Sequence, residues 1–99
     1  MTHKFALPEP QGIEQAPTDG SVLELARVWV SPQGPAIMVR PAYDDPRAMG
    51  QMLAELCWHF AHAYEQRGFT QPQALAALKQ GWIEGHANGD AAQKQGGVQ

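Results

Sequence analysis

The feature that constrains this chain most is a pair of apolar segments joined by a tight turn. The sequence reads SVLELARVWV, then SPQG, then PAIMVRP. Runs rich in Val, Ile and Trp between turn residues predict strands. Pro32 at the second turn position and Gly34 at the fourth are typical of a type I turn, in which Gly34 can adopt a positive φ. We therefore predict a β-hairpin over about residues 22–40, with its turn centred on Pro32 and Gln33.

With the turn at this position, we expect Trp29 opposite Ile37 and Val28 opposite Met38. Neither face of the hairpin is then properly polar. The expected faces are Leu23, Leu25, Arg27, Trp29, Ile37 and Val39 on one side, and Val22, Glu24, Val28, Val30, Met38 and Arg40 on the other. An isolated two-stranded hairpin is only marginally stable in water, and both of its edges are unpaired. We expect helices of the same chain to cover one face, and a second copy of the chain to cover or extend the rest.

The segment DDPRAMGQMLAELCWHFAHAYEQRG carries the strongest helix signal. Asp44 or Asp45 can accept hydrogen bonds from the first free N–H groups, and Pro46 suits the first helical position. Gly68 is typical of a helix end. These signals predict a first helix over about residues 45–67.

A second helix is predicted over about residues 71–88. Thr70 and Gln73 form a capping box at its start, and the Asn88–Gly89 pair predicts its end. The fold class is therefore α+β, a hairpin followed by two α-helices. The expected organisation is a flexible or extended lead-in over 1–20, one small domain over 21–89, and a disordered, Gly-rich tail over 90–99.

Composition argues against several classes of partner. The net charge is −3, the pI is about 5.7, and the seven Lys and Arg are scattered, whereas nucleic-acid binders usually carry a basic patch. Cys57 is the single cysteine, so no disulfide can form within the chain. No segment approaches the roughly 20 apolar residues of a membrane span, and no signal-peptide core is visible. We expect a cytoplasmic protein that binds neither nucleic acid nor membrane.

A stripe of small residues runs along the first helix at spacing i, i+4, i+7 and i+11: Gly50, Ala54, Cys57 and Ala61. A helix-interior glycine costs about 1 kcal/mol relative to alanine, so Gly50 suggests close packing against another backbone. That backbone is either the second helix, through Leu75, Leu78 and Trp82, or the same helix of a second subunit. Cys57 is interpreted as a small apolar group in this stripe.

Trp58 stands apart, because it falls among the polar residues of the first helix. Trp is enriched at interaction hot spots, so Trp58 predicts an intermolecular contact, although the N-terminal segment could also cover it. The interface candidates are therefore Trp58, Gly50, Ala54 and Ala61.

Glu55, His59 and His62 lie three and four residues apart and can lean over one patch of a helix. Two imidazoles and a carboxylate can serve as the three protein ligands of a catalytic zinc. The HExxH pattern is absent, and the same residues also fit a plain solvated face. The alternatives are a zinc site, a pH-sensitive contact and a solvated surface.

The predicted hairpin and first helix resemble those of a family of small uncharacterised alphaproteobacterial proteins, a domain of unknown function. Its pattern is an L-x-R-x-W strand followed by a helix of the form W-G-x-x-L-A-D-x-x-R-H-x-A-x-A-Y. The residues that match are Leu25, Arg27, Trp29, Gly50, Leu53, Ala54, His59, Ala61, Ala63 and Tyr64. Met49, Glu55 and Trp58 stand where the family has Trp, Asp and Arg. The resemblance implies a compact, dimeric α+β domain of unassigned activity, and it assigns no catalytic residue.

Because Arg27 and His59 both belong to that pattern, Arg27 is a candidate for a structural pairing with Glu55 or a helix-end carbonyl. The expected function is a non-catalytic, homodimeric interaction or accessory module without a cofactor, which an unknown protein partner could also use. One alternative is a metal-binding protein or metal-dependent enzyme that uses Glu55, His59 and His62. Another is a small-ligand binder between the hairpin and the helices, lined by Met38, Met49, Met52 and Trp29.

Overall fold

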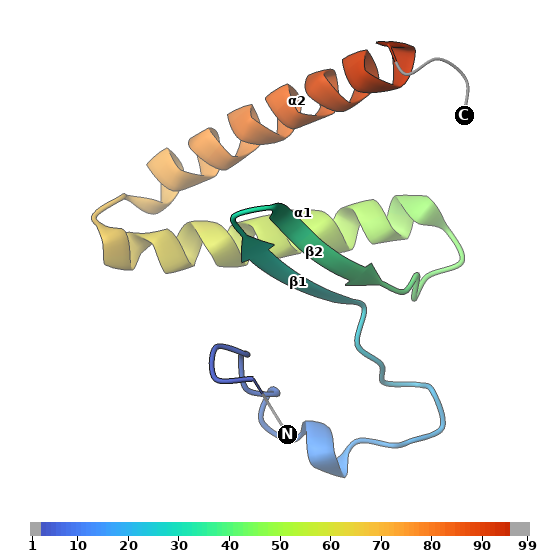
Figure 1. The fold of residues 1–99 in the computed structure, drawn as a ribbon. Coiled ribbons are helices and arrows are strands. Elements are labelled where there is room, and N and C mark those ends of the chain that lie inside the picture. The colour runs from blue at the N-terminus through green and yellow to red at the C-terminus, as the bar shows by residue number, and fades with distance from the viewer. Residues whose placement is uncertain (1–2, 96–99) are drawn as a thin grey trace. The chain divides into compact units, whose positions relative to one another are not determined.

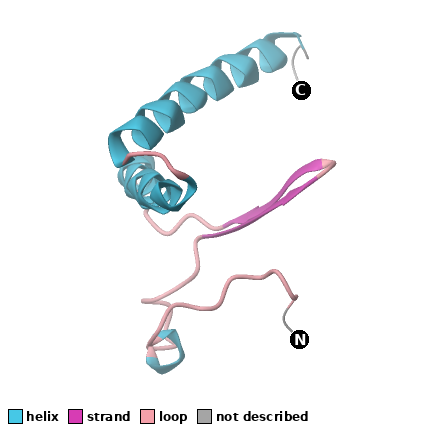
Figure 2. Cartoon of the chain, turned by 90° about the vertical axis from the view of Figure 1, so that its left-hand side faces the viewer, coloured by secondary structure: helices cyan, strands magenta, loops and turns pink. Residues whose placement is uncertain are grey.

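The computed structural model describes residues 3–95 and confirms the α+β class. The elements follow in the order η1 Ile13–Gln15, β1 Ala26–Ser31, β2 Gly34–Val39, α1 Pro46–Ala63, η2 Tyr64–Arg67 and α2 Gln71–Gln95 (Figure 1). The chain divides into two compact units, Met1–Ala42 with the strands and Tyr43–Gln99 with the two long helices. Figure 2 colours the chain by secondary structure, with the two strands in magenta and the helices, η1 included, in cyan. The division into a lead-in, one domain over 21–89 and a tail stays a prediction.

The hairpin turn lies where the sequence predicts it. Ser31 pairs with Gly34, which leaves Pro32 and Gln33 as the two turn residues. Gly34 has φ +114°, a region that residues with a Cβ rarely adopt. The Ser31 hydroxyl donates a hydrogen bond to the Gly34 carbonyl over 2.8 Å. The predicted position of the turn and the positive φ of Gly34 are confirmed.

The predicted strand register is wrong by one residue. Trp29 lies opposite Ala36 and Val28 opposite Ile37. With two turn residues, the Ser31–Gly34 pair comes first, and every later pair is set by counting outward from it. Because side chains alternate between faces, a slip of one residue moves each β2 side chain to the other face.

The corrected register makes the two faces of the hairpin unequal. Arg27, Trp29 and Met38 share one face with Ala36. The opposite face is apolar throughout: Ala26, Val28, Val30, Pro35, Ile37 and Val39. Its Val30 and Val39 side chains are 90% and 74% exposed.

An aromatic pair joins the described part of the lead-in to the hairpin. The His3 ring meets Trp29 edge-on, with centroids 5.0 Å apart.

Further along the lead-in, the Asp19 carboxylate accepts hydrogen bonds from the Ser21 hydroxyl at 2.7 Å and the Ser21 N–H at 3.0 Å. Both bonds favour the ionised carboxylate and therefore lower the pKa of Asp19. The bond from the Ser21 hydroxyl has the larger effect.

Helix α1 begins as the sequence predicts. The Asp45 carboxylate accepts a hydrogen bond from the Arg47 N–H at 3.0 Å, and Pro46 occupies the first turn. Regular α-helix ends at Ala63, after which η2 tightens the chain before Gly68 reverses it at φ +93°. The predicted range 45–67 therefore corresponds to α1 together with η2.

Helix α2 extends past its predicted end near residue 88. The Asn88–Gly89 pair stays helical, because neither residue has the positive φ that would stop the helix. Ala91 and Ala92 then continue the helix, as good helix formers do. The last predicted tail residues, 96–99, lie outside the described residues.

Helices α1 and α2 meet at one end and separate toward the other (Figure 1). Among the described residues, the buried hydrophobic side chains are Ala61 on α1 and Ala74 on α2. At the turn, Tyr64 and Phe69 pack edge to face with ring centroids 5.8 Å apart. Within the described range no large side chain is fully buried, so the helical unit has almost no core of its own.

Candidate functional site

The space between the diverging helices is an apolar groove with a volume of about 820 Å³. We refer to it as the helix groove. Its lining consists of Gly50, Leu53, Ala54, Leu56, Cys57, Trp58, Phe60, Tyr64, Phe69, Ala74, Leu75, Ala77, Leu78, Lys79, Gly81 and Trp82. A groove of this size and composition can bury a large apolar surface.

The α1 wall combines the predicted small-residue stripe with larger neighbours. Gly50, Ala54 and Cys57 lie along the groove. Leu53 and Phe60, which flank them, are 44% and 52% exposed. The stripe therefore faces α2, one of the two alternatives left open by the sequence, but the helices are too far apart here to close over it.

The glycines of both walls show how open the groove is. A Cβ built on Gly50 of α1 or on Gly81 of α2 would meet nothing within 4 Å. Close packing would compensate for the helix propensity lost at a glycine. The described part of the chain supplies no such packing at either position, so both glycines leave room for an incoming backbone.

Each wall of the groove carries a tryptophan, Trp58 on α1 and Trp82 on α2. Their side chains are 51% and 59% exposed. The Trp82 ring also contacts the His86 ring, one helical turn later, with centroids 4.3 Å apart and the ring planes tilted by 56°. The sequence places Trp58 among polar neighbours, whereas the structure makes it part of an apolar surface.

Of the interface candidates, Gly50, Ala54 and Trp58 line the groove, while Ala61 is buried closer to the end where the helices meet. Sequence reasoning named Leu75, Leu78 and Trp82 only as packing partners for the stripe. It placed Phe60 on the large-residue face of the first helix, and it did not predict a groove that Phe60 and Phe69 line together. The sequence shows that both residues are apolar, but it does not show the angle between the helices that places both in one groove.

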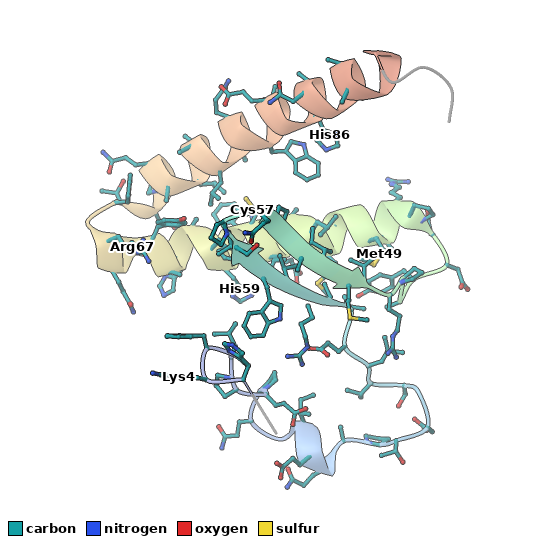
Figure 3. All side chains as sticks on the ribbon, viewed as in Figure 1. Lys4, Met49, Cys57, His59, Arg67 and His86 are labelled. Carbon is teal, nitrogen blue, oxygen red and sulfur yellow. The ribbon has the colours of Figure 1, made fainter. Side chains whose placement is uncertain are left out.

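The groove offers little acid–base chemistry. Among its described lining residues, Lys79 is the one Lys, Arg, Asp or Glu. Cys57 is a free, half-buried thiol, and Figure 3 shows it on the side of α1 that faces α2. His59 points away from α2, so it does not approach this thiol (Figure 3). The arrangement suits apolar contact.

Glu55, His59 and His62 are not brought together as a ligand set. Over residues 3–95, no group of three or more His, Cys, Asp and Glu side chains is arranged to hold a metal ion. His62 instead approaches Glu65, with Nδ1 2.8 Å from the carboxylate. Both partners are exposed, so the pair adds little stability. A zinc site at this face stays an untested alternative.

Arg27 has a partner close by in the sequence. Its Nη2 donates to both carboxylate oxygens of Glu24, at 3.1 and 2.8 Å. This exposed pair lies within the unit of the hairpin. The pairing of Arg27 with Glu55 would join the two units and stays a prediction.

Residues 6–87 match a family described as a domain of unknown function, DUF5076. The chain belongs to this family. The match includes both strands, all of α1 and most of α2, so the predicted resemblance to a domain family of unknown function is confirmed. The DUF5076 description names no activity and therefore assigns no role to the groove.

One solved structure shares the fold of this DUF5076 chain. It is described as the "structure of a putative pyruvate dehydrogenase from the photosynthetic bacterium Rhodopseudomonas palustrus CGA009". The sequences are 24% identical, the alignment covers 88% of this chain and 99% of that one, and the TM-score is 0.64. At this identity the likeness concerns the fold alone. No curated protein matches the chain.

No helix within the described range combines the length and the apolar character needed to cross a membrane. Helix α2 is the longest, and it carries Lys79, Glu84 and Asp90 along its length.

Proposed function

We propose that this DUF5076 chain is a non-catalytic, homodimeric interaction module, and that the helix groove is part of its self-association surface. The observation that supports this most is the near absence of a core in the helical unit. Two alanines are the buried hydrophobic residues of the described chain, while Trp58, Phe60 and Trp82 are half exposed or more. Small domains that bury so little usually depend on oligomerisation.

The exposed apolar area of the groove is the right size for a dimer. Seven of its large side chains are 38% exposed or more: Leu53, Leu56, Trp58, Phe60, Tyr64, Phe69 and Trp82. Aromatic side chains bury 150–250 Å² each when fully covered. Covering these partly exposed side chains therefore removes on the order of 700 Å² per copy from water, close to the roughly 800 Å² per partner of a standard interface.

A second copy of the chain is the occupant that fits this need. The groove must be covered whenever the chain is folded, and an identical chain is always present in equal amount. Obligate homodimers meet the same requirement, because their folding and association are a single process. A two-fold interface uses the same patch on both copies, so the aromatic residues of one groove can pack against the small-residue stripe of the other.

The test is the solution mass of Leu78→Glu. Leu78 lines the groove on α2, and a carboxylate there would have to be buried without a partner. We expect this variant to lose the dimer at concentrations where the wild-type chain keeps it, with a dissociation constant raised at least about tenfold, equivalent to 1.4 kcal/mol. Sedimentation equilibrium measures this constant.

Ala76→Glu is the matched control. Ala76 lies on the same helix, is exposed and does not line the groove. It introduces the same charge into the same helix, so it should leave the dissociation constant unchanged. Equal constants for Leu78→Glu and the wild type would show that the groove is not part of the interface.

A further inference from the structure

The two edges of the hairpin differ in their ability to accept another strand. In an antiparallel pair, the N–H and C=O of one residue point to the same side of the strand, and successive residues alternate. The Arg40 N–H donates to the Leu25 carbonyl at 2.7 Å, so the backbone groups of Leu25 and Arg40 face each other. By alternation, the even-numbered residues of β1 and the odd-numbered residues of β2 face outward.

The outer edge of β2 is blunted by proline. Pro35 is one of its outward-facing residues and has no N–H to donate. Pro41, the next outward position after Val39, extends the same defect past the strand end. Prolines on an edge strand prevent pairing with further strands. Only Ile37 and Val39 remain as outward donors in β2.

The outer edge of β1 has no such block. Ala26, Val28 and Val30 face outward, and each has an N–H and a C=O. Within residues 3–95, no backbone hydrogen bond from another segment reaches any of the three. An open edge of this kind is a template for strand addition, and a hairpin on its own is only marginally stable.

We infer that β1 pairs antiparallel with β1 of a second copy, so that two hairpins form one four-stranded sheet. The inference rests on the proposed homodimer and assigns part of its interface to this edge. Antiparallel pairing of a strand with its own copy is compatible with a two-fold axis. Because only even-numbered residues face outward, even-numbered residues must lie opposite even-numbered ones.

This parity has a consequence for the apolar face. Residues opposite each other in an antiparallel pair place their side chains on the same face. Ala26, Val28 and Val30 belong to the apolar face, together with Ile37 and Val39 of β2. Pairing through the open edge therefore joins the two apolar faces into one continuous surface. A pairing with odd-numbered residues opposite even-numbered ones would break it up but cannot form the hydrogen bonds.

The register follows from the same residues. When Val28 lies opposite Val28 of the other copy, Ala26 lies opposite Val30, so all three outward-facing residues of each strand are paired. Arg27 of one copy then lies opposite Trp29 of the other, where a guanidinium can rest on an indole face. A register shifted by two residues toward the strand start would place the two Arg27 side chains opposite each other, which is unfavourable. The register is therefore centred on Val28.

The first experiment is disulfide cross-linking in a Cys57→Ala background, which removes the native thiol. In the Val28→Cys chain the two new thiols lie directly opposite, with Cα atoms about 5.5 Å apart, a distance that a disulfide spans. In the Val30→Cys chain they are roughly 14 Å apart, since each lies two residues from the axis. Val30 is the more exposed of the two positions, at 90% against 63%. If the cross-links arose from random collisions between chains, the control variant Val30→Cys would therefore react faster.

We expect Val28→Cys to form the disulfide-linked dimer at least about tenfold faster than Val30→Cys under mild oxidation, because only opposed strand positions meet the geometry of a disulfide. Faster cross-linking of Val30→Cys would overturn the inference. Light scattering of the reduced Cys57→Ala chain separates the two proposals. A dimer without preferential Val28→Cys cross-linking removes the sheet pairing alone, whereas a folded monomer removes both.

Amide hydrogen exchange of the unaltered chain provides a second readout that needs no variant. We expect the Ala26, Val28 and Val30 N–H groups to exchange at least about tenfold more slowly than those of Ile37 and Val39, because protection follows hydrogen bonding within stable structure. Protected Ile37 and Val39 amides together with unprotected β1 amides would assign the interface to the opposite edge and overturn the inference.

Discussion

Thr70 and Gln73 cap each other at the start of α2. The Thr70 N–H donates to the Gln73 side-chain oxygen at 2.9 Å, and the Gln73 N–H donates to the Thr70 hydroxyl at 3.2 Å. This reciprocal pair, with Gly68 just before it, determines where α2 begins and therefore where the two walls of the helix groove meet.

Thr70→Ala should destabilise the folded protein by about 1 kcal/mol, because it removes the hydroxyl that satisfies a free N–H of the first turn. For a chain of this size that corresponds to a fall in melting temperature of roughly 4–8 °C. Circular dichroism at matched protein concentration measures it. Gln73→Glu keeps a side-chain acceptor and should stay within about 0.5 kcal/mol of wild type. Equal melting temperatures for Thr70→Ala and wild type would show that the cap is not needed.

Trp58→Glu should weaken self-association by at least about 2 kcal/mol, the range of an interface hot spot. The reason is that a half-exposed indole lining the groove is replaced by a carboxylate that must lose water on association. Sedimentation equilibrium gives the dissociation constant. Gln51→Glu, an exposed change on the same helix and outside the groove lining, should leave it unaltered. If both variants behave alike, charge rather than position would explain the effect.

Chelation should not change the assembly. Because Glu55, His59 and His62 are not arranged as a ligand set, we expect the chain, purified without a polyhistidine tag, to carry no stoichiometric zinc. Its solution mass should be the same with and without chelator. Elemental analysis that finds one zinc per chain, lost in His59→Ala, would establish the metal site and contradict this expectation.

The Asp19 carboxyl should titrate below the usual range for aspartate. Hydrogen bonds from Ser21 stabilise its ionised form and lower its pKa in the folded state. A lowered folded-state pKa means that these bonds contribute stability above the unfolded-state pKa, and that the contribution disappears as pH falls through the folded value. Carboxyl NMR titration of Ser21→Ala should show the pKa of Asp19 rising toward its ordinary value. An unchanged pKa would mean that the turn at Ser21 does not persist in solution.

Local sequence rules predicted the parts of this fold that depend on neighbouring residues. The Pro32–Gln33 turn, the Asp45 cap and the Thr70–Gln73 box all involve contacts within a few residues, and each occurs where expected. The predicted register was wrong by one residue although the turn was placed correctly, because the count outward from the turn did not start at the Ser31–Gly34 pair. Counted from that pair, Val28 lies opposite Ile37. The predicted end of α2 near residue 88 was wrong because an Asn-Gly pair can end a helix but does not always do so.

The helix groove depends on information that no single segment carries. The small-residue stripe from Gly50 to Ala61 indicated that another backbone would come close, and α2 is that neighbour at Ala61 and Ala74. The divergence of the helices beyond that point follows from their packing angle. That angle is set by how the ridges of both helices fit together, and it leaves Trp58 facing the groove instead of the polar surface suggested by its neighbours.

The central claim is that the folded chain exists as a pair, and light scattering of the untagged chain over a hundredfold dilution, followed in parallel by circular dichroism, tests it most directly. We predict twice the 10.8 kDa chain mass at the higher concentrations, and a loss of helical signal that accompanies dissociation at the lower ones, because folding and association are coupled. A chain that stays at 10.8 kDa with full helical signal across the whole range would contradict the account.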